Sequence, residues 1–122
     1  DNVRLMCEPG RALVAEAESL IVRVEARRGD DLFINDGGYG MLFDAAHLNW
    51  IFPAQLVSRA PQKGEGTEAF ALWGPTCDSI DYMKGPFVLP ANIKEGDYIE
   101  IGNVGAYGRA IGGRFNGYGA YL

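Results

Sequence analysis

Apolar and polar residues alternate along much of this chain, which is the pattern of β-strands with one buried face. In residues 20–27, apolar side chains occupy the even positions, and charged side chains occupy positions 23, 25 and 27. Shorter runs of this kind are separated by turns rich in glycine, proline and aspartate. They cover residues 32–35, 55–58, 68–73, 87–89 and 97–101. The spacing predicts a mainly β domain, folded as a sandwich or barrel.

Helical patterns are the minority. Residues 11–18 follow Pro9-Gly10 and are rich in alanine and glutamate, which predicts one short helix near the N-terminus. A further turn or two of helix is expected after Val104, and residues 61–67 are expected to form an exposed polar loop. The 17 glycines fall at turns without a period, so the 122 residues are interpreted as one domain without repeats or a linker.

The formal net charge of −5 argues against nucleic acid or an anionic membrane as the main partner, because both attract clustered Lys and Arg. An acidic chain instead favours a cationic substrate. No apolar run approaches the roughly 20 residues of a membrane span, and the first residues lack the layout of a signal peptide. Cys7 and Cys77 can form only one bridge, and each lies in a motif where a free thiol is useful. We therefore expect a reducing, cytoplasmic setting.

The motif Glu8-Pro9-Gly10-Arg11 has the composition of a phosphate cradle. Gly10 permits close approach of the backbone, the start of the following helix offers free N–H groups, and Arg11 adds a forked donor. Glu8 can then face a ring nitrogen that gains from a proton. The alternative is a Pro-Gly turn with a surface Glu–Arg pair. Because the motif lies almost at the start of the chain, we expect the chain to be part of a longer polypeptide.

The motif Trp73-Gly74-Pro75-Thr76-Cys77-Asp78 places a thiol beside a carboxylate. Gly74-Pro75 ends a predicted strand, so Cys77 and Asp78 are expected in a loop, where functional side chains often lie. Asp78 can bind a substrate ammonium, and Cys77 can donate a proton or act as a nucleophile. The alternative is a small buried thiol beside an N-capping aspartate.

The other candidate segments are interpreted structurally. The glycines of residues 36–40 predict a hairpin turn. His47 is the only histidine and has no Cys or Asp partner at metal spacing, so we expect a structural or surface role and no metal site. Residues 102–119 are glycine-rich with interleaved aromatic residues, but Arg109 and Arg114 are too few for an RNA-binding platform. A loop that packs against a ligand or a partner subunit is expected there.

Taken in order, the motifs of the chain resemble a known family. They are Glu8-Pro9-Gly10-Arg11, Asn35-Asp36-Gly37, Trp73-Gly74-Pro75-Thr76-Cys77-Asp78, Gly105-Ala106-Tyr107 and Phe115-Asn116-Gly117. Nearly the whole chain resembles the C-terminal portion of a pyridoxal-phosphate-dependent ornithine/diaminopimelate-type decarboxylase, of group IV and fold type III, with an alanine-racemase-like fold. Within that group it is most similar to bacterial ornithine decarboxylase.

The resemblance implies a two-domain enzyme that binds pyridoxal 5'-phosphate and forms a homodimer with active sites shared across the interface. Residues 1–18 would end an N-terminal β/α barrel and connect it to the C-terminal β-domain of residues 19–122. The barrel would carry the lysine that holds the cofactor. We therefore expect the 122 residues alone neither to bind the cofactor tightly nor to release CO2.

The resemblance also implies roles for the cofactor-binding residues. Glu8 would pair with the pyridine nitrogen and keep it protonated, so that the ring acts as an electron sink. The phosphate would be bound by Gly10, Arg11 and Tyr107.

On the substrate side, the resemblance implies that Cys77 reaches in from the partner subunit and protonates the α-carbon after CO2 loss. Asp78 would bind the distal ammonium of the substrate, and Asp44 would be a second acid for that ammonium. Phe115 would form a wall of the pocket.

Substrate choice is indicated by the residue beside the thiol. Diaminopimelate decarboxylases usually carry Cys-Glu-Ser-Gly-Asp, whereas this chain has Cys77-Asp78-Ser79-Ile80-Asp81. This favours ornithine, converted to putrescine in polyamine biosynthesis. Lysine or dual specificity stays open, because one methylene is worth only about 1–3 kcal/mol of discrimination, and diaminopimelate is a further alternative. Two hypotheses from other functional classes are a non-catalytic regulatory homologue and a freestanding β-domain that binds a ligand.

Overall fold

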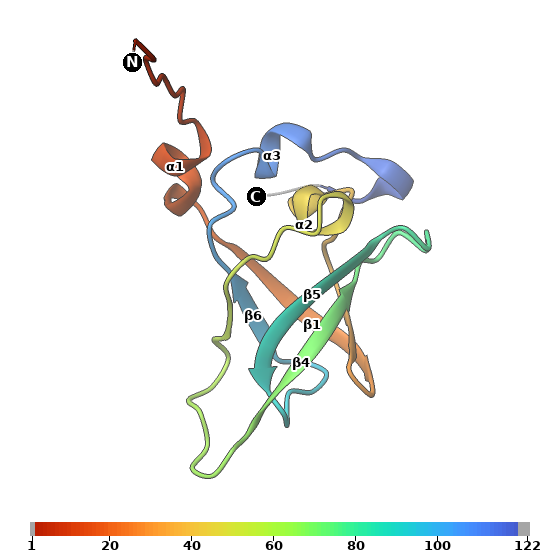
Figure 1. Cartoon of the computed structure of the whole chain (residues 1–122). Helices are drawn as coiled ribbons and strands as arrows, with labels where there is room; N and C mark the ends of the chain where they lie inside the picture. Colours follow the sequence, from red (N-terminus) through yellow and green to blue (C-terminus); the bar gives the residue numbers. More distant parts are fainter. Residues whose placement is uncertain (1, 120–122) are drawn as a thin grey trace.

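Six strands form one strongly curved sheet in the computed structural model, which describes residues 2–119 (Figure 1). The strands are β1 (Leu20–Arg28), β2 (Asp31–Ile34), β3 (Ala54–Leu56), β4 (Thr67–Trp73), β5 (Tyr82–Pro90) and β6 (Tyr98–Ile101). Their order is β3-β6-β1-β2-β4-β5, and only β2 and β4 are parallel neighbours. The terminal strands β3 and β5 also contact each other. The sheet is therefore a nearly closed barrel, as the alternating pattern predicts.

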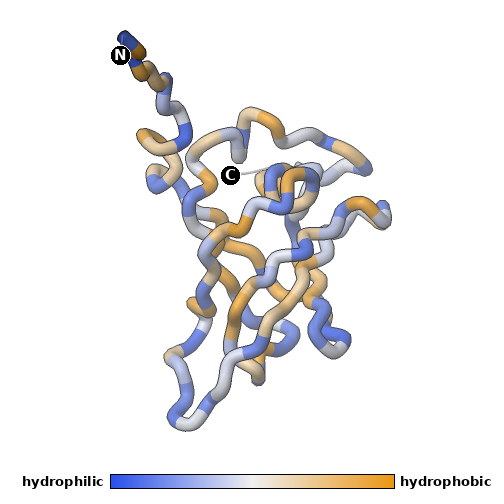
Figure 2. The backbone as a smooth tube through the Cα atoms, viewed as in Figure 1, coloured by the Kyte–Doolittle hydropathy of each residue, from blue (hydrophilic) through white to orange (hydrophobic). Residues whose placement is uncertain are grey.

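The long strand β1 joins the two halves of the barrel. Its N-terminal half pairs with β6, and its C-terminal half pairs with β2, with a shift of register between Val24 and Ala26. Leu20, Val22 and Val24 are buried, as the alternation predicts. Figure 2 shows hydrophobic residues along the strands and hydrophilic residues in the loop between β3 and β4. The core is thus supplied by one face of every strand.

Most of the largest fully buried side chains come from the strands. Phe70 on β4 is paired with Phe87 on β5, and both are 1% exposed. Ile99 and Ile101 of β6 are completely buried. Burial of aromatic and branched side chains from both sheet halves gives the chain a core large enough to hold the loops at its end in fixed positions.

Short helices cluster at one end of the barrel (Figure 1). They are α1 (Arg11–Val14), which continues as the 3₁₀ turn η1 (Ala15–Ala17), α2 (Phe43–His47), α3 (Gly108–Ile111) and the 3₁₀ turn η2 (Phe115–Gly117). The helix predicted for residues 11–18 is found as one α-helical turn followed by a 3₁₀ turn and ends before Glu18, and the helical turn predicted after Val104 is confirmed. The short helix α2 was not predicted from the sequence. None of the helices within residues 2–119 has the length and apolar character to cross a bilayer.

The hairpin turn predicted for residues 36–40 is wrong. The sheet neighbours of β2 are β1 and β4, so the segment after β2 does not return to pair with it. Instead, the side chain of Asp36 accepts the N–H of Met41 at 3.1 Å, and the carbonyl of Gly37 accepts the N–H groups of Gly40 and Leu42. These bonds wind the chain into α2.

Strand β5 begins five residues before the predicted run 87–89 and ends one residue after it. Its first part pairs with the end of β4, where Leu72 faces Met83 and Trp73 faces Tyr82. The register shifts between Phe70 and Leu72, opposite Gly85-Pro86. Because a strand tolerates glycine and proline at such an irregularity, the pair interrupts the hydrophobic pattern without ending the strand.

Candidate functional site

The loop after β4 is built around the carboxylate of Asp81, which is 1% exposed. One oxygen, Oδ2, accepts the N–H and the hydroxyl of Thr76 at 3.2 and 2.7 Å. The other, Oδ1, accepts the N–H of Gly38 at 2.8 Å. A backbone bond from Gly74 N–H to the carbonyl of Asp81, at 2.9 Å, closes the loop. Asp81 therefore ties residues 74–81 to the segment that follows β2.

Two glycines make room for this carboxylate. A β-carbon at Gly37 or at Gly74 would overlap the oxygens of Asp81. Neither glycine has a positive φ, so glycine is not needed there for its backbone conformation. It is needed because the Asp81 carboxylate approaches the backbone closely. Glycine at both positions allows the two loops to pack against one buried acid.

Cys77 lies at the exposed tip of this loop. Its φ of 63° is in the left-handed region, which is unusual for a residue other than Gly, Asn or Asp. Its thiol approaches the carbonyl of Pro75 at 4.0 Å. The alternative of a buried thiol is therefore wrong, and Cys7 and Cys77 are both free and exposed. An exposed thiol on a strained backbone is a common feature of functional sites.

The neighbouring Asp78 is held on both carboxylate oxygens. Oδ1 accepts the N–H of Ile80 at 3.0 Å, and Oδ2 accepts the Tyr39 hydroxyl at 2.6 Å. The bond from Tyr39, followed by that from Ile80, lowers the pKa of Asp78 below its ordinary value. The same bond and the nearby negative charges raise the pKa of Tyr39 to about 12. Asp78 is thus a fixed, ionised carboxylate.

The C-terminal segment packs against the same loop. The ring of Phe115 stacks on Tyr39, with the centroids 4.3 Å apart, and Asn116 Nδ2 donates to the carbonyl of Thr76 at 2.7 Å. We refer to Tyr39, Cys77, Asp78 and Phe115 as the thiol cluster. It can bind a cation at Asp78 and offer a proton or a nucleophile at Cys77.

A second group, the guanidinium cluster, consists of Gly10, Arg11, Asp44, Trp50 and Tyr107. Arg11 opens α1, and its Nη2 forms an ion pair of 2.5 Å with Oδ2 of the buried Asp44 on α2. The guanidinium carbon lies 4.2 Å from the ring centroid of Trp50 and 5.3 Å from that of Tyr107. A β-carbon at Gly10 would lie 3.9 Å from the Tyr107 hydroxyl. The site of Arg11 is therefore assembled from four separate segments.

One nitrogen of Arg11 has no partner. Nη1 is buried and makes no hydrogen bond in the described part of the chain. A buried guanidinium N–H without an acceptor is costly, because its hydration is lost without replacement. An anionic oxygen placed beside Nη1 would satisfy it, so the guanidinium cluster is chemically suited to bind an anion.

Glu8 is not brought to either cluster. Residues 2–10 are all exposed, and the segment extends away from the barrel (Figure 1). The carboxylate of Glu8 makes no hydrogen bond or ion pair with residues 2–119. Of the four residues predicted to bind the cofactor, the structure thus gathers Gly10, Arg11 and Tyr107 and leaves Glu8 apart.

The two clusters are separate units of the structure. Within residues 2–119, no hydrogen bond, ion pair or ring contact joins Arg11, Asp44 or Tyr107 to the thiol cluster. Asp44, expected as a second acid for the substrate ammonium, forms its ion pair with Arg11 of the guanidinium cluster.

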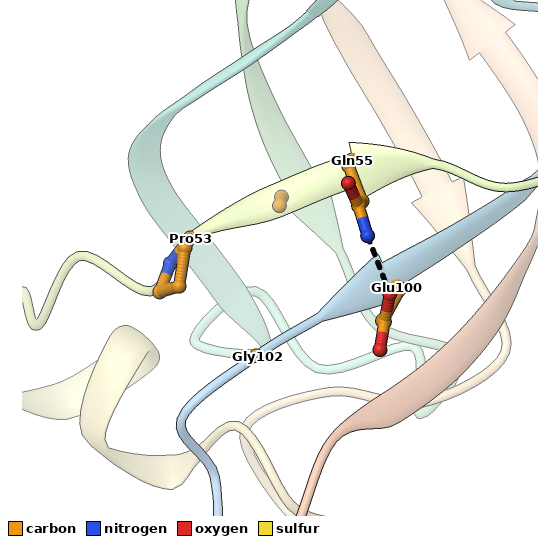
Figure 3. Close-up of a pocket in the computed structure, with 5 residues that line it drawn as sticks. Pro53, Gln55, Glu100 and Gly102 are labelled. Carbon is orange, nitrogen blue, oxygen red and sulfur yellow. Dashed lines mark hydrogen bonds between the residues drawn. The ribbon is translucent and has the colours of Figure 1, made fainter. Parts of the chain in front are cut away.

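Cavities lie beside the thiol cluster and at the sheet edge. A cavity of about 450 Å³ adjoins Cys77 and Asp78 and is walled by Phe33 and Trp73. A cavity of about 290 Å³ lies beside the edge strand β3, where Gln55 Nε2 donates to Glu100 at 2.6 Å (Figure 3). None of the predicted site residues lines the second cavity.

His47, at the end of α2, is exposed, and its ring lies 4.5 Å from that of Phe43. This agrees with a surface role. No three His, Cys, Asp or Glu side chains in the described range come together as a metal site.

Three residues of these clusters and loops were not predicted to have a role. Tyr39 lies between the glycines of a predicted turn, Trp50 lies outside every motif, and Asp81 follows Cys77 and Asp78, the predicted functional residues of its segment. In the sequence, Asp81 is marked only as an acid that follows Asp78 and lies near a glycine. That its carboxylate packs against both Gly37 and Gly74 is shown only by the fold.

Comparison with known proteins places these features in a family. The family described as pyridoxal-dependent decarboxylase, C-terminal sheet domain, matches residues 12–105. Antizyme inhibitor 2 of Xenopus laevis is 34% identical over 96% of this chain and 29% of its own length. Ornithine decarboxylase of Schizosaccharomyces pombe is 34% identical over 96% of this chain and 30% of its own length. The chain thus spans about 30% of the length of the curated relatives it matches.

A solved structure shows the same fold. The arginine decarboxylase of Paramecium bursaria Chlorella virus superposes with a TM-score of 0.80 and 29% identity, over 93% of this chain and 31% of that one.

Gly74→Ala should destabilise the chain by about 1–3 kcal/mol, because the new methyl group overpacks against the buried Asp81 carboxylate. Gly66→Ala is the matched control, since a β-carbon there meets no atom within 4 Å, and it should change stability by at most about 1 kcal/mol. Urea unfolding measures both. Equal stability of the two variants would contradict the packing described for Asp81.

Tyr39 should titrate with a pKa of about 12, because its hydroxyl donates to the ionised Asp78. Asp78→Ala should return this pKa toward about 10, the ordinary value. Since the folded pKa is the higher one, the stabilisation from this bond is present below pH ~10 and is lost as the pH rises through 12. The ultraviolet difference between the native chain and Tyr39→Phe isolates the phenol, and a pKa near 10 in the native chain would disprove the bond.

Proposed function

The chain belongs to the family of the C-terminal sheet domain of pyridoxal-dependent decarboxylases, and we propose that it supplies one side of the active site in a decarboxylase of basic amino acids. The observation that carries the proposal is the thiol cluster. An exposed Cys77 is held at a φ of 63° beside Asp78, whose pKa is lowered. These two groups provide a proton donor and a cation site, which are what decarboxylation of a basic amino acid requires of the protein.

Pyridoxal phosphate, the cofactor for which the family is named, fits the guanidinium cluster, because the unpartnered Nη1 of Arg11 calls for an anionic oxygen. When bound, the cofactor supplies the electron sink for the electron pair left by CO2 loss. We propose that Arg11, Tyr107 and the backbone at Gly10 bind its phosphate. Glu8 is proposed to bind the pyridine nitrogen and keep it protonated.

On the substrate side, Asp78 is proposed to bind the distal ammonium. Its carboxylate is fixed by Tyr39 and Ile80 and stays ionised at neutral pH, so a cation can dock without reorienting it. Asp44 is proposed as a second acid, because only its Oδ2 takes part in the ion pair with Arg11. Phe115 is proposed to form a wall of the pocket.

The thiol of Cys77 is proposed to deliver its proton to the α-carbon after CO2 has left. The exposed position at the loop tip gives the sulfur access to a substrate. Cys77 then regains a proton from solvent, so the thiol is unchanged after each turnover.

The separation of the two clusters supports a homodimer with shared sites. We propose that Cys77 and Asp78 of one protomer face Arg11 and Tyr107 of its partner, because contacts within one chain do not bring them together. Residues 1–18 are proposed to end an N-terminal β/α barrel that carries the Schiff-base lysine, and residues 19–122 to form the C-terminal β-domain. The two free thiols suit a reducing compartment, and we propose the cytoplasm.

Ornithine is the proposed substrate, with putrescine as product. The support is the ornithine decarboxylase of S. pombe at 34% identity, together with the short acid Asp78 beside the thiol. Lysine is the second candidate. A non-catalytic regulatory role is a further candidate, favoured by the similar identity to antizyme inhibitor 2. The exposed Cys77 and the unpartnered Arg11 nitrogen favour catalysis, because neither serves the fold.

The test is CO2 release by the complete polypeptide that carries this chain and the barrel, supplied with pyridoxal phosphate. Ornithine, lysine, arginine and diaminopimelate are offered in parallel. Ornithine turnover should be the fastest and should fall by about 100-fold or more in Cys77→Ala, the loss expected for a general acid. Cys7→Ala is the matched control and should retain full activity. Bound cofactor without turnover of any substrate would favour the regulatory role instead.

A further inference from the structure

Trp50 lies against Arg11, although it belongs to none of the motifs that define the family site. The indole ring centroid is 4.2 Å from the guanidinium carbon, which is closer than the Tyr107 ring at 5.3 Å. Trp50 is 44% exposed, so its burial contributes little to the core. A guanidinium over an indole face is a favourable cation–π contact.

The backbone around Trp50 is arranged to place the ring there. After the end of α2, Asn49 adopts a left-handed backbone conformation with a φ of 52°. The N–H groups of Leu48 and Trp50 then donate to the carbonyl of Asp44, both at 3.0 Å. Asp44 thus holds Trp50 through its carbonyl and Arg11 through its carboxylate.

The guanidinium of Arg11 is therefore held by two neighbouring side chains, and one of its nitrogens has no hydrogen-bond partner. Asp44 takes Nη2, Trp50 covers the plane, and Nη1 is buried without a hydrogen-bond partner. A buried donor without a partner costs free energy, and an anionic oxygen beside Nη1 would recover it. The arrangement fixes the direction of Nη1 before any anion is bound, so less side-chain freedom is lost on binding.

We propose that Trp50 is a positioning residue for the cofactor phosphate. It acts through Arg11, by holding the guanidinium plane so that Nη1 faces the phosphate oxygens. This inference rests on the proposed function and deepens it, because it adds a residue that determines how firmly the phosphate group is bound.

The test compares two ligands that differ only in the phosphate. Dissociation constants of pyridoxal phosphate and of pyridoxal are measured for the complete polypeptide, for Trp50→Leu and for Trp50→Phe. Trp50→Leu should raise the dissociation constant of pyridoxal phosphate by about 3- to 30-fold, the loss of affinity expected for a cation–π contact. Binding of pyridoxal should not change. Trp50→Phe keeps an aromatic face and should restore most of the affinity. The ³¹P resonance of bound pyridoxal phosphate should shift in Trp50→Leu and return in Trp50→Phe.

Two controls separate the outcomes. Tyr98→Leu removes an aromatic side chain of matching exposure, 43%, on the outer face of β6, and should leave both affinities unchanged. Arg11→Ala should weaken pyridoxal phosphate but not pyridoxal. If Arg11→Ala has this effect and Trp50→Leu does not, the inference is overturned and the phosphate site stands. Equal weakening of both ligands by Trp50→Leu would also overturn it, as a structural effect. If Arg11→Ala changes neither ligand, the phosphate site of the proposed function is wrong, and the inference fails with it.

Discussion

The buried carboxylate of Asp81 is the constraint on which the thiol cluster depends. It accepts three hydrogen bonds, two from Thr76 and one from Gly38. It also packs so closely against Gly37 and Gly74 that neither position has room for a β-carbon. A buried polar side chain is tolerated when it is hydrogen-bonded in this way. Because Thr76 precedes Cys77 and Gly38 precedes Tyr39, one acid sets the position of both the thiol and the phenol that holds Asp78. Leaving one of these donors unsatisfied would cost about 1–3 kcal/mol, so the loop conformation is strongly favoured.

Backbone strain occurs in both the thiol cluster and the guanidinium cluster. Five residues other than glycine have a positive φ within residues 2–119: Asn49, Cys77, Asn103, Tyr107 and Asn116. Asparagine tolerates this conformation, whereas Cys and Tyr adopt it at a cost of about 1–3 kcal/mol each. Cys77 and Tyr107 belong to the thiol cluster and the guanidinium cluster, respectively. The barrel core therefore stabilises loops whose local conformation is unfavourable, which is the usual relation between a scaffold and a functional site.

The barrel was predictable from the sequence because each strand needs only its own alternation of apolar and polar residues, as in residues 20–27. The sequence-based predictions were wrong where a local sequence pattern is compatible with two structures. The glycines at 37 and 38 suggest a hairpin, but their place is decided by the distant Asp81, and Gly85-Pro86 suggests a break where the strand continues. Motif order predicted the candidate site residues. It could not show that Asp44 pairs with Arg11, or that Trp50 covers Arg11, because both facts depend on contacts between remote segments.

The central claim is that the guanidinium cluster of one protomer works with the thiol cluster of its partner. The most direct measurement is ornithine decarboxylation by a one-to-one mixture of two inactive variants of the complete polypeptide, Arg11→Ala and Cys77→Ala, after dissociation and reassociation. If sites are shared, half of the dimers are mixed and each contains one intact site, so activity should return to about a quarter of the native value. If both clusters served a site within one chain, the mixture would stay as inactive as either variant alone.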